Sequence, residues 1–307
     1  MTPGADMGSR RVNSKGLWCW FAVLPAVGMA WGEERIEARE IAENVWFVNH
    51  FFAVRNISYG SRRNPFHVAN LPPRGKVKRY TLERHLNNDY DEGDVRARDL
   101  VIFRSGKLRG TGILVDIPKD AKRPMSFAIW LPALRKVRRH AEPDQADAWG
   151  GSLFTYGDIY LRRPEDEYHE LLGTERFDGC LGLPGKPLQG LPEPSCEAEG
   201  RPVWRLRSNT RFANWWYDYR EVLVDKRTYA DYRSIYFKNG EPIKIIDKDW
   251  RSMGLADPRG QYWLYWYGRD LRSGLEGVAW VTREQVVWNR EVDPGLWSLG
   301  TLRRLSR

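Results

Sequence analysis

The sequence contains few of the residues that build catalytic and metal-binding sites. Its 307 residues include only three cysteines and five histidines, and no two histidines have the spacing that places both on one face of a metal-binding helix. Ser152 lies in Gly-Gly-Ser-Leu-Phe, which is not the nucleophile elbow of a hydrolase. Asp89, Asp91 and Asp94 do not have the spacing of an EF-hand calcium loop. These absences predict a protein that is not an enzyme and that holds no metal or cofactor.

Long apolar runs are also absent beyond the first 30 residues, so we expect no transmembrane helix there. The first 30 residues combine three basic residues, a short apolar run and a small-residue cleavage site, namely Arg10, Arg11 and Lys15, Leu17–Val27, and Gly28-Met29-Ala30. This arrangement is typical of a secretory signal peptide. The apolar run is shorter than the ~20 residues that a helix needs to span a bilayer, so we expect cleavage. The mature protein, residues 31–307, is then expected to be soluble in the periplasm.

Cleavage would remove Cys19 and leave two cysteines, Cys180 and Cys196. Exported proteins meet an oxidising compartment, so we expect these two to form a disulfide. They lie within residues 178–200, a stretch rich in glycine and proline that is predicted to be a loop inserted into the domain. Two buried free thiols are the alternative. A zinc site is not expected, because two thiols without a nearby histidine cannot complete a tetrahedral shell.

Most of the chain after Tyr80 has the pattern of β-strands. Residues 125–131, Met-Ser-Phe-Ala-Ile-Trp-Leu, alternate between two faces, as half-buried strands do. Similar segments predict about ten strands, and their short connections favour antiparallel pairing. An amphipathic helix is predicted within residues 33–52, and residues 58–78 are predicted to be a loop because prolines interrupt them. The fold class is therefore mainly β (α+β). A sheet of this width curls, but the pattern alone leaves a half-barrel, a closed barrel and a sandwich open.

Three short signatures occur in order along the chain: Arg-Gly-Thr-Gly-Ile-Leu at 109–114, Trp-Leu-Pro-Ala-Leu-Arg-Lys-Val-Arg-Arg at 130–139, and Gly-Ser-Leu-Phe-Thr-Tyr-Gly-Asp at 151–158. With them the chain resembles the LolA-like outer-membrane lipoprotein-sorting proteins, in the branch found beside RND-type exporters. Two positions depart from the pattern of that family. Leu153 stands where the family often has aspartate, and Gly157 stands where it often has an acidic residue.

The resemblance implies a single LolA-like domain over residues 31–307, folded as a curved antiparallel half-barrel with the N-terminal helix across its concave face. It implies a periplasmic carrier that shelters the acyl chains of lipoproteins or lipids in a hydrophobic cavity and moves them toward the outer membrane, without a cofactor. An outer-membrane receptor or an RND-type exporter would be its partner, and its contact with the membrane would be transient. We expect a monomer.

Two groups of residues are candidates for such a site. The side chains expected to bind the lipid are Trp130, Phe103, Ile113, Val115, Phe154 and Tyr156. A basic cluster is expected to form a rim that binds an anionic head group, because guanidinium groups make bidentate bonds to phosphate and carboxylate. Its members are Arg135, Arg138 and Arg139. Each group also has a simpler interpretation: the aromatic residues would be core, and the arginines would be the charged edge of a sheet.

Two other functions remain open on the sequence. One is a periplasmic accessory subunit of an RND-type exporter that binds no ligand. The other is a small outer-membrane β-barrel, although the chain ends in Arg307 rather than an aromatic residue and many strands carry charge on both faces. The net charge of +9 would also suit nucleic acid. A secreted protein rarely meets DNA, however, so no nucleic-acid partner is expected.

We predict that N-terminal sequencing of the mature protein from a periplasmic extract gives a start near Trp31, because the small-residue cleavage site ends at Ala30. A chain that keeps residues 1–30, or one that is found only in membranes, would contradict the signal peptide.

Overall fold

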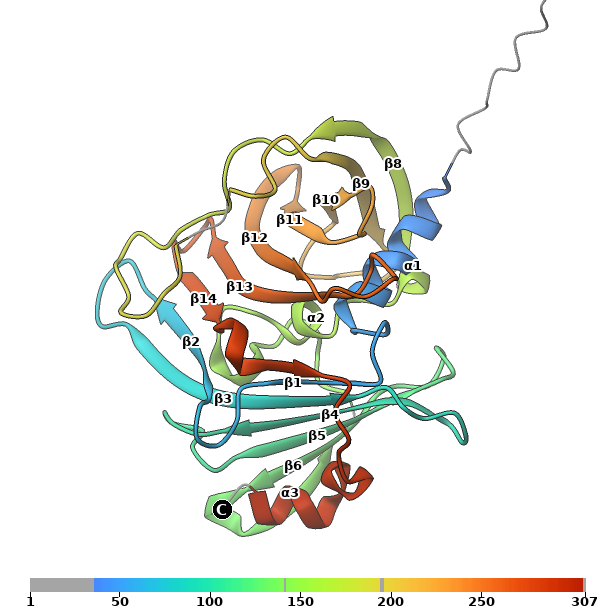
Figure 1. The fold of residues 1–307 in the computed structure, drawn as a ribbon. Coiled ribbons are helices and arrows are strands. Elements are labelled where there is room, and N and C mark those ends of the chain that lie inside the picture. The colour runs from blue at the N-terminus through green and yellow to red at the C-terminus, as the bar shows by residue number, and fades with distance from the viewer. Residues whose placement is uncertain (1–35, 141, 194–195, 306–307) are drawn as a thin grey trace, which may run out of the picture. The chain divides into compact units, whose positions relative to one another are not determined.

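The computed structural model describes residues 36–140, 142–193 and 196–305, so the predicted signal peptide lies outside the described residues. The chain from Ile36 onward forms one compact unit. Within the described ranges, no helix has both the length and the apolar character needed to cross a membrane. The strands form one large, open antiparallel sheet whose inner face is concave (Figure 1). We call the space on this concave side, which side chains of the core fill, the hollow. The mainly β fold class and the curved antiparallel sheet are therefore confirmed.

Fifteen strands in the described part of the chain belong to this sheet. They are β1 (Asn56–Tyr59), β2 (Phe66–Leu71), β3 (Lys78–Asn87), β4 (Val95–Phe103), β5 (Gly112–Pro118), β6 (Ser126–Leu131), β7 (Lys136–His140), β8 (Glu167–Arg176), β9 (Pro202–Thr210), β10 (Tyr219–Asp225), β11 (Asp231–Lys238), β12 (Glu241–Ser252), β13 (Gln261–Asp270), β14 (Glu276–Trp280) and β15 (Val286–Trp288). Their hydrogen-bonded order is β7-β6-β5-β4-β3-β2-β14-β13-β12-β11-β10-β9-β8, and β1 pairs with β3 and β15.

The sequence predicted fewer strands than the sheet contains. β2 lies inside residues 58–78, which were expected to form a loop because of their prolines. In the structure Pro65 and Pro72 flank this strand, where their missing amide protons take no bond from the ladder. β7 contains Arg138 and Arg139 of the basic cluster. The sequence did not predict this strand, because the run of charged residues does not alternate between apolar and polar.

The two edge strands of the sheet are consecutive in the chain. β2 pairs with β14, and this pairing joins a meander of β2 to β7 to a second meander of β8 to β14. The ends of the strand order are therefore β7 and β8. The segment between them has to pass from one edge of the curved sheet to the other. It does so across the inner, concave face, where its short helix α2 (Tyr156–Ile159) lies in the hollow (Figure 1).

The N-terminal helix also lies on the inner face. The described α-helices are α1 (Ala38–Asn49), α2 and α3 (Leu299–Leu305), and the 3₁₀ helices are η1 (Pro132–Leu134), η2 (Trp149–Gly151), η3 (Pro164–Asp166), η4 (Arg283–Gln285) and η5 (Pro294–Trp297). Ile41 and Val45 of α1 form an apolar stripe that packs against Trp204 and Leu206 on β9. The helix predicted within residues 33–52 is therefore present and lies across the concave face, near the β8 end of the sheet.

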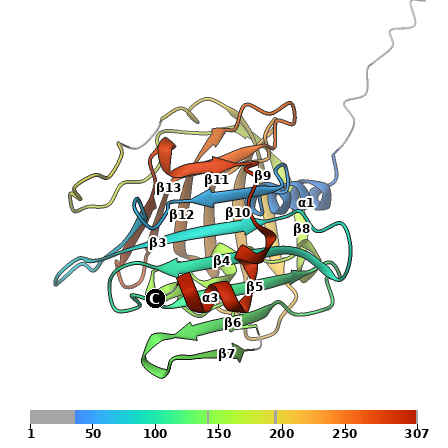
Figure 2. The same cartoon turned by 60° about the horizontal axis from the view of Figure 1, so that its bottom comes forward.

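The outer face of the sheet is covered in two places. Trp297 and Leu302, from η5 and α3, pack against Leu114 on β5, and Figure 2 shows α3 lying across this part of the sheet. Leu188, from the loop that follows β8, packs on the core around Trp280 of β14. Because the sheet is covered on both faces here, β13 can be aromatic on both of its sides.

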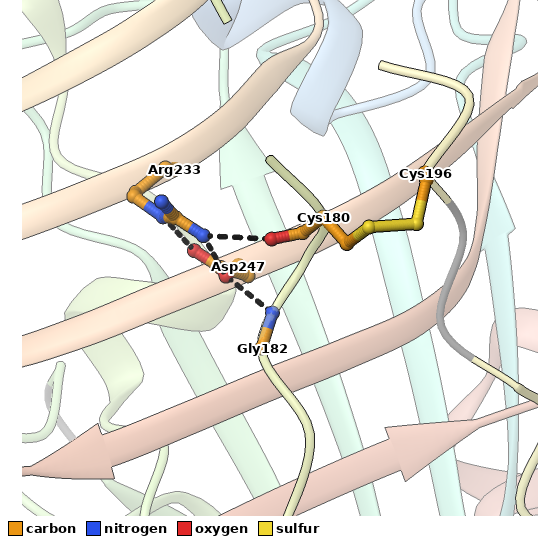
Figure 3. Close-up of a disulfide and its surroundings, with 5 residues drawn as sticks. All are labelled: Cys180, Gly182, Cys196, Arg233 and Asp247. Carbon is orange, nitrogen blue, oxygen red and sulfur yellow. Dashed lines mark hydrogen bonds and ion pairs between the residues drawn. A yellow bond between two sulfur atoms is a disulfide. The ribbon is translucent and has the colours of Figure 1, made fainter. Parts of the chain in front are cut away.

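The Gly/Pro-rich loop is fixed to the sheet by a disulfide and a buried carboxylate (Figure 3). Cys180 and Cys196 are joined, with their Cα atoms 4.3 Å apart, so the predicted disulfide is confirmed. Asp247 on β12 accepts a hydrogen bond from the amide of Gly182 at 2.7 Å and forms an ion pair with Arg233. Arg233 in turn donates to the carbonyl of Cys180 at 3.2 Å.

Replacing both cysteines with serine is expected to lower the free energy of unfolding by about 3 kcal/mol, because the bond closes a short loop in the unfolded chain. Urea denaturation of the mature protein measures this loss. Thiol labelling of the wild type under denaturing, non-reducing conditions should find no free thiol. Two labels per mature chain would contradict the bridge.

Candidate functional site

The inner face of β3 to β6 is an apolar wall. Phe103 on β4 and Ile113 and Val115 on β5 are buried there, together with Phe127 on β6, in one large core. They share this face because residues two apart on a strand point to the same side of the sheet. Three of the predicted lipid-binding residues therefore line the hollow of the half-barrel.

A segment of the chain fills the hollow in front of this wall. We call residues 142–163, which connect β7 to β8, the plug. Its Trp149 ring lies 5.9 Å from the ring of Phe103, and its Phe154 ring meets the edge of Trp266 on β13 at 5.6 Å. The plug therefore contacts both halves of the sheet at once and closes the hollow with aromatic side chains.

Two glycines in the sheet make room for the plug. A Cβ atom on Gly277 of β14 would lie 2.6 Å from the Cβ of Leu153, and one on Gly268 of β13 would lie 2.8 Å from its Cδ2. Asn70 on β2 holds the same turn, donating to the Gly151 carbonyl at 2.8 Å and accepting from the Leu153 amide at 3.0 Å. The plug and the sheet are thus matched both in shape and in hydrogen bonding.

The plug also places a carboxylate against the sheet. Asp158 accepts a hydrogen bond from the Thr155 amide at 2.8 Å in the capping box of α2, so its position is fixed locally. It accepts a second from the Tyr236 hydroxyl at 2.8 Å and forms an ion pair with Lys244 on β12. Burial raises the pKa of Asp158, but the Lys244 ammonium and the hydrogen bonds outweigh it, so this pKa lies below its ordinary value.

Three further ion pairs are buried on the inner face, and both partners of each belong to the strands. They are Arg84 with Asp99, Arg220 with Glu167, and Lys248 with Asp231. Removing one partner of such a pair leaves an uncompensated charge and costs about 3–5 kcal/mol. These three pairs are therefore part of the framework of the sheet, whereas Lys244 takes its carboxylate from the plug.

An open pocket of about 600 Å³ adjoins the plug between β2, β3 and the turn that joins β4 to β5. Gly150 and Gly151 of the plug form one side of it. Val77, Tyr80 and Leu108 form its apolar walls. Three exposed cations also line it, the ammonium groups of Lys78 and Lys107 and the guanidinium group of Arg79. Its volume is within the range of small-ligand sites. This combination suits an amphiphile with an anionic head.

A second pocket of about 410 Å³ lies beside α1. Its lining includes the carboxylates of Glu43 and Glu165 and four cations, which are Arg96, Lys119, Arg163 and Arg259. Because charged side chains make up half of this lining, the pocket suits an acyl chain less well than the pocket next to the plug. The pocket next to the plug is therefore the better candidate for a functional site.

The predicted lipid-binding residues do not form one wall. Trp130 on β6 lies on the outer face, where it is buried against Trp297 beneath the C-terminal segment. The remaining five lie on the inner face or in the plug that covers it, and these are Phe103, Ile113, Val115, Phe154 and Tyr156. That these residues contact a lipid stays a prediction.

The predicted arginine rim lies away from the pocket. Arg135 follows η1, and Arg138 and Arg139 belong to the edge strand β7. All three side chains are exposed. None of the three is among the described residues that line the pocket. The arginines and the pocket lysines are thus two distinct basic regions.

Sequence reasoning missed Lys78, Lys107 and Lys244. For Lys244 a signal was present, because it stands in the middle of a predicted strand between Ile243 and Ile245. A charged residue at such a position has to be paired if it faces the core. No comparable signal marks the two pocket lysines, since exposed lysines are common on any surface.

A family model described as "-like: Uncharacterized protein" matches residues 96–250, which is half of the chain. The chain belongs to this family. The matched residues run from β4 to β12 and include the whole plug and Lys244. No curated protein matches the sequence at comparable significance.

Several solved structures share the fold over most of the chain. A DUF1329 family protein from Desulfovibrio piger has a TM-score of 0.64 at 14% identity, over 86% of this chain and 98% of that one. A putative outer membrane lipoprotein-sorting protein domain from Vibrio parahaemolyticus has 0.63 at 16%, over 87% and 98%. A LolA superfamily protein from Nitrosomonas europaea has 0.53 at 13%, over 87% and 100%. The LolA-like fold that the three signatures predicted is therefore confirmed.

Gly277→Ala is expected to destabilise the protein by about 1–3 kcal/mol, the usual cost of overpacking a core. The new Cβ would lie 2.6 Å from the Cβ of Leu153, so the plug or β14 has to shift. Gly185→Ala is the matched control, because its nearest atom, Oε2 of Glu276, is 3.6 Å away. Urea denaturation compares the two. Equal stabilities would mean that the plug does not pack on this glycine.

Proposed function

We propose that the protein is a periplasmic carrier that binds the acyl chains of lipids or lipoproteins and moves them toward the outer membrane. Its mechanism is sequestration of apolar chains on the inner face of the half-barrel, with no covalent step. The observation that supports this most directly is the 600 Å³ pocket, which has apolar walls and two exposed lysines and adjoins the plug. The similarity of fold to a putative lipoprotein-sorting domain points the same way.

The energetics of such a site favour binding of even part of one chain. Burying a methylene group contributes about 0.8 kcal/mol, so a few carbons of an acyl chain already give useful affinity. Lys78 and Lys107 would attract the acidic head group, and the walls around Tyr80 would take the first carbons of the chain. The ligand class that fits is an amphiphile with an anionic head.

The proposed compartment follows from the N-terminal signal and the disulfide. The segment up to Ala30 has the composition of a signal peptide, and a Cys180–Cys196 bridge persists in an oxidising compartment. We therefore assign residues 31–307 to one carrier domain in the periplasm. An outer-membrane receptor or an exporter subunit would receive the cargo.

A second candidate is an accessory subunit that holds no ligand. It is favoured by the plug, which fills the hollow, and by the exposed basic edge strand β7, which is available to a partner. Native mass spectrometry of protein purified without detergent separates the two functions. A carrier retains co-purified lipid, and an accessory subunit has the mass of the chain alone.

Replacing both Lys78 and Lys107 with glutamine is expected to weaken the binding of a fluorescent fatty acid about two- to thirtyfold, since each exposed charge contributes ~0.2–1 kcal/mol. Binding of the matching fatty alcohol should not change, because it has no charge to lose. Fluorescence titration of both probes measures this.

The control is the double variant Arg138→Gln and Arg139→Gln, which removes two exposed charges from β7. It should bind both probes like the wild type. If this variant loses more fatty-acid affinity than the lysine variant, the head group binds at the arginine rim that the sequence predicted.

A further inference from the structure

Lys244 differs from the other buried cations of the hollow in the origin of its carboxylate. Its ammonium group pairs with Asp158 of the plug and donates to the Leu153 carbonyl at 3.2 Å, and the ring of Trp216 lies 5.2 Å away. The side chains of Lys244 and Asp158 are only 6% and 1% exposed. Arg84, Arg220 and Lys248 are paired within the sheet. Among the described inner-face cations, Lys244 is thus the one that loses its carboxylate when the plug leaves.

The plug presents to the sheet the same groups as an anionic amphiphile, namely apolar side chains and a carboxylate. Leu153 fills the space left by Gly268 and Gly277, and Phe154 packs on Trp266. Asp158, in the same segment, supplies the anion. An acyl chain with an acidic head group presents the same sequence of groups, with apolar carbons at one end and an oxyanion at the other.

Within the described ranges, no hydrogen bond joins the backbone of the plug to the backbone of the sheet. In the described residues its backbone bonds close within the plug, as from the Trp149 amide to the Phe154 carbonyl at 2.8 Å and from the Tyr156 amide to the Asp147 carbonyl at 3.0 Å. Among the described residues, the hydrogen bonds between the plug and the inner face all involve side chains. Asn70, Tyr236 and Lys244 of the sheet bond to the plug, and Arg162 of the plug donates to the Thr210 hydroxyl on β9 at 2.8 Å. Because no ladder bond has to break, the plug can leave as a folded unit.

We propose that an anionic amphiphile displaces the plug from the hollow. Its head group replaces the Asp158 carboxylate on Lys244, and its chain replaces Leu153 and Phe154 against β13 and β14. This inference rests on the proposed carrier function and adds to it the buried cation that selects an acidic ligand. In this exchange Lys78 and Lys107 attract the head group at the pocket beside Gly150, and Lys244 holds it once the plug has left.

Two variants that both loosen the plug test this exchange. Asp158→Asn removes the anion of the plug but leaves Lys244, so a dansyl-labelled fatty acid should bind about tenfold more tightly, because a larger fraction of the protein is open. Lys244→Met also removes the ion pair, but it leaves no cation for the head group. The methyl ester of the same probe should then bind more tightly, while the ratio of acid to ester affinity falls below that of the wild type.

Lys248→Met is the matched control. It breaks a buried ion pair with Asp231, whose carboxylate belongs to β11, so it should lower the melting temperature without changing the acid-to-ester ratio. Should Asp158→Asn fail to fold, Tyr236→Phe removes a single hydrogen bond to the same carboxylate. It should raise the affinity for the acid as Asp158→Asn does, by a smaller factor.

The outcomes separate the exchange from the carrier function itself. If Lys244→Met keeps the wild-type acid-to-ester ratio, Lys244 does not hold the head group and the exchange is wrong, although binding stands. If Asp158→Asn binds the acid no more tightly than the wild type, the ligand does not displace the plug. If neither the wild type nor any variant binds either probe, the carrier function is wrong as well.

Hydrogen exchange of the wild-type protein gives an independent reading. Adding the fatty acid should speed exchange of the plug amides between Trp149 and Tyr160, because the bound chain occupies their place. It should slow exchange in β13 and β14. Slower exchange in the plug would mean that it closes over the ligand, and this would overturn the displacement.

Discussion

The pairing of β2 with β14 is the contact on which the rest of the structure depends. It joins two meanders of successive strands into one sheet and leaves β7 and β8 at its two ends. Since these strands are consecutive in the chain, their connection has to cross the sheet. Crossing the hollow lets Trp149, Leu153 and Phe154 bury their side chains, which contributes about 1.5–3 kcal/mol for each large apolar group. Because of this topology, the connection between β7 and β8 fills the half-barrel with its own side chains.

The two walls of the hollow differ in chemistry. The wall formed by β4 to β6 is largely apolar, whereas β8 to β12 carry three of the four buried ion pairs. Such pairs add little net stability, because desolvation offsets their attraction. Packing of rings contributes more, as where Tyr59 stacks on Trp263 with centroids 4.4 Å apart. The buried ion pairs between strands contribute specificity for one register of the strands. A slip of one residue would bury each charge without its partner.

Local patterns in the sequence predicted the parts of the fold that depend on local physics. Alternation along residues 125–131 predicted β6, and the spacing of Ile41 and Val45 predicted α1. The period of two also separated Trp130 from Phe127, but it did not tell which face lines the hollow. That depends on the partner of β2, which lies about 200 residues further along the chain and leaves no mark on the local pattern.

The plug could not be predicted for the same reason, although two of its residues stood out in the sequence. Leu153 and Gly157 depart from the family pattern, and the structure gives each a reason. Leu153 fits the space beside Gly268 and Gly277, and a Cβ on Gly157 would lie 3.1 Å from the Gln145 carbonyl oxygen. Leu153 is a large apolar residue in a turn, and such a residue needs a buried contact. Its partner can be found only once the strands are ordered.

The long-range pairing of β2 with β14 also determines the order in which the chain can fold. Leu71 pairs with Glu276, so the edge of β2 has no partner until nearly the whole polypeptide has emerged from the ribosome. During that interval β2 to β7 present an unpaired edge and an apolar face, a combination that recruits other strands. A holding chaperone during synthesis and transport would keep this half from aggregating until β14 arrives.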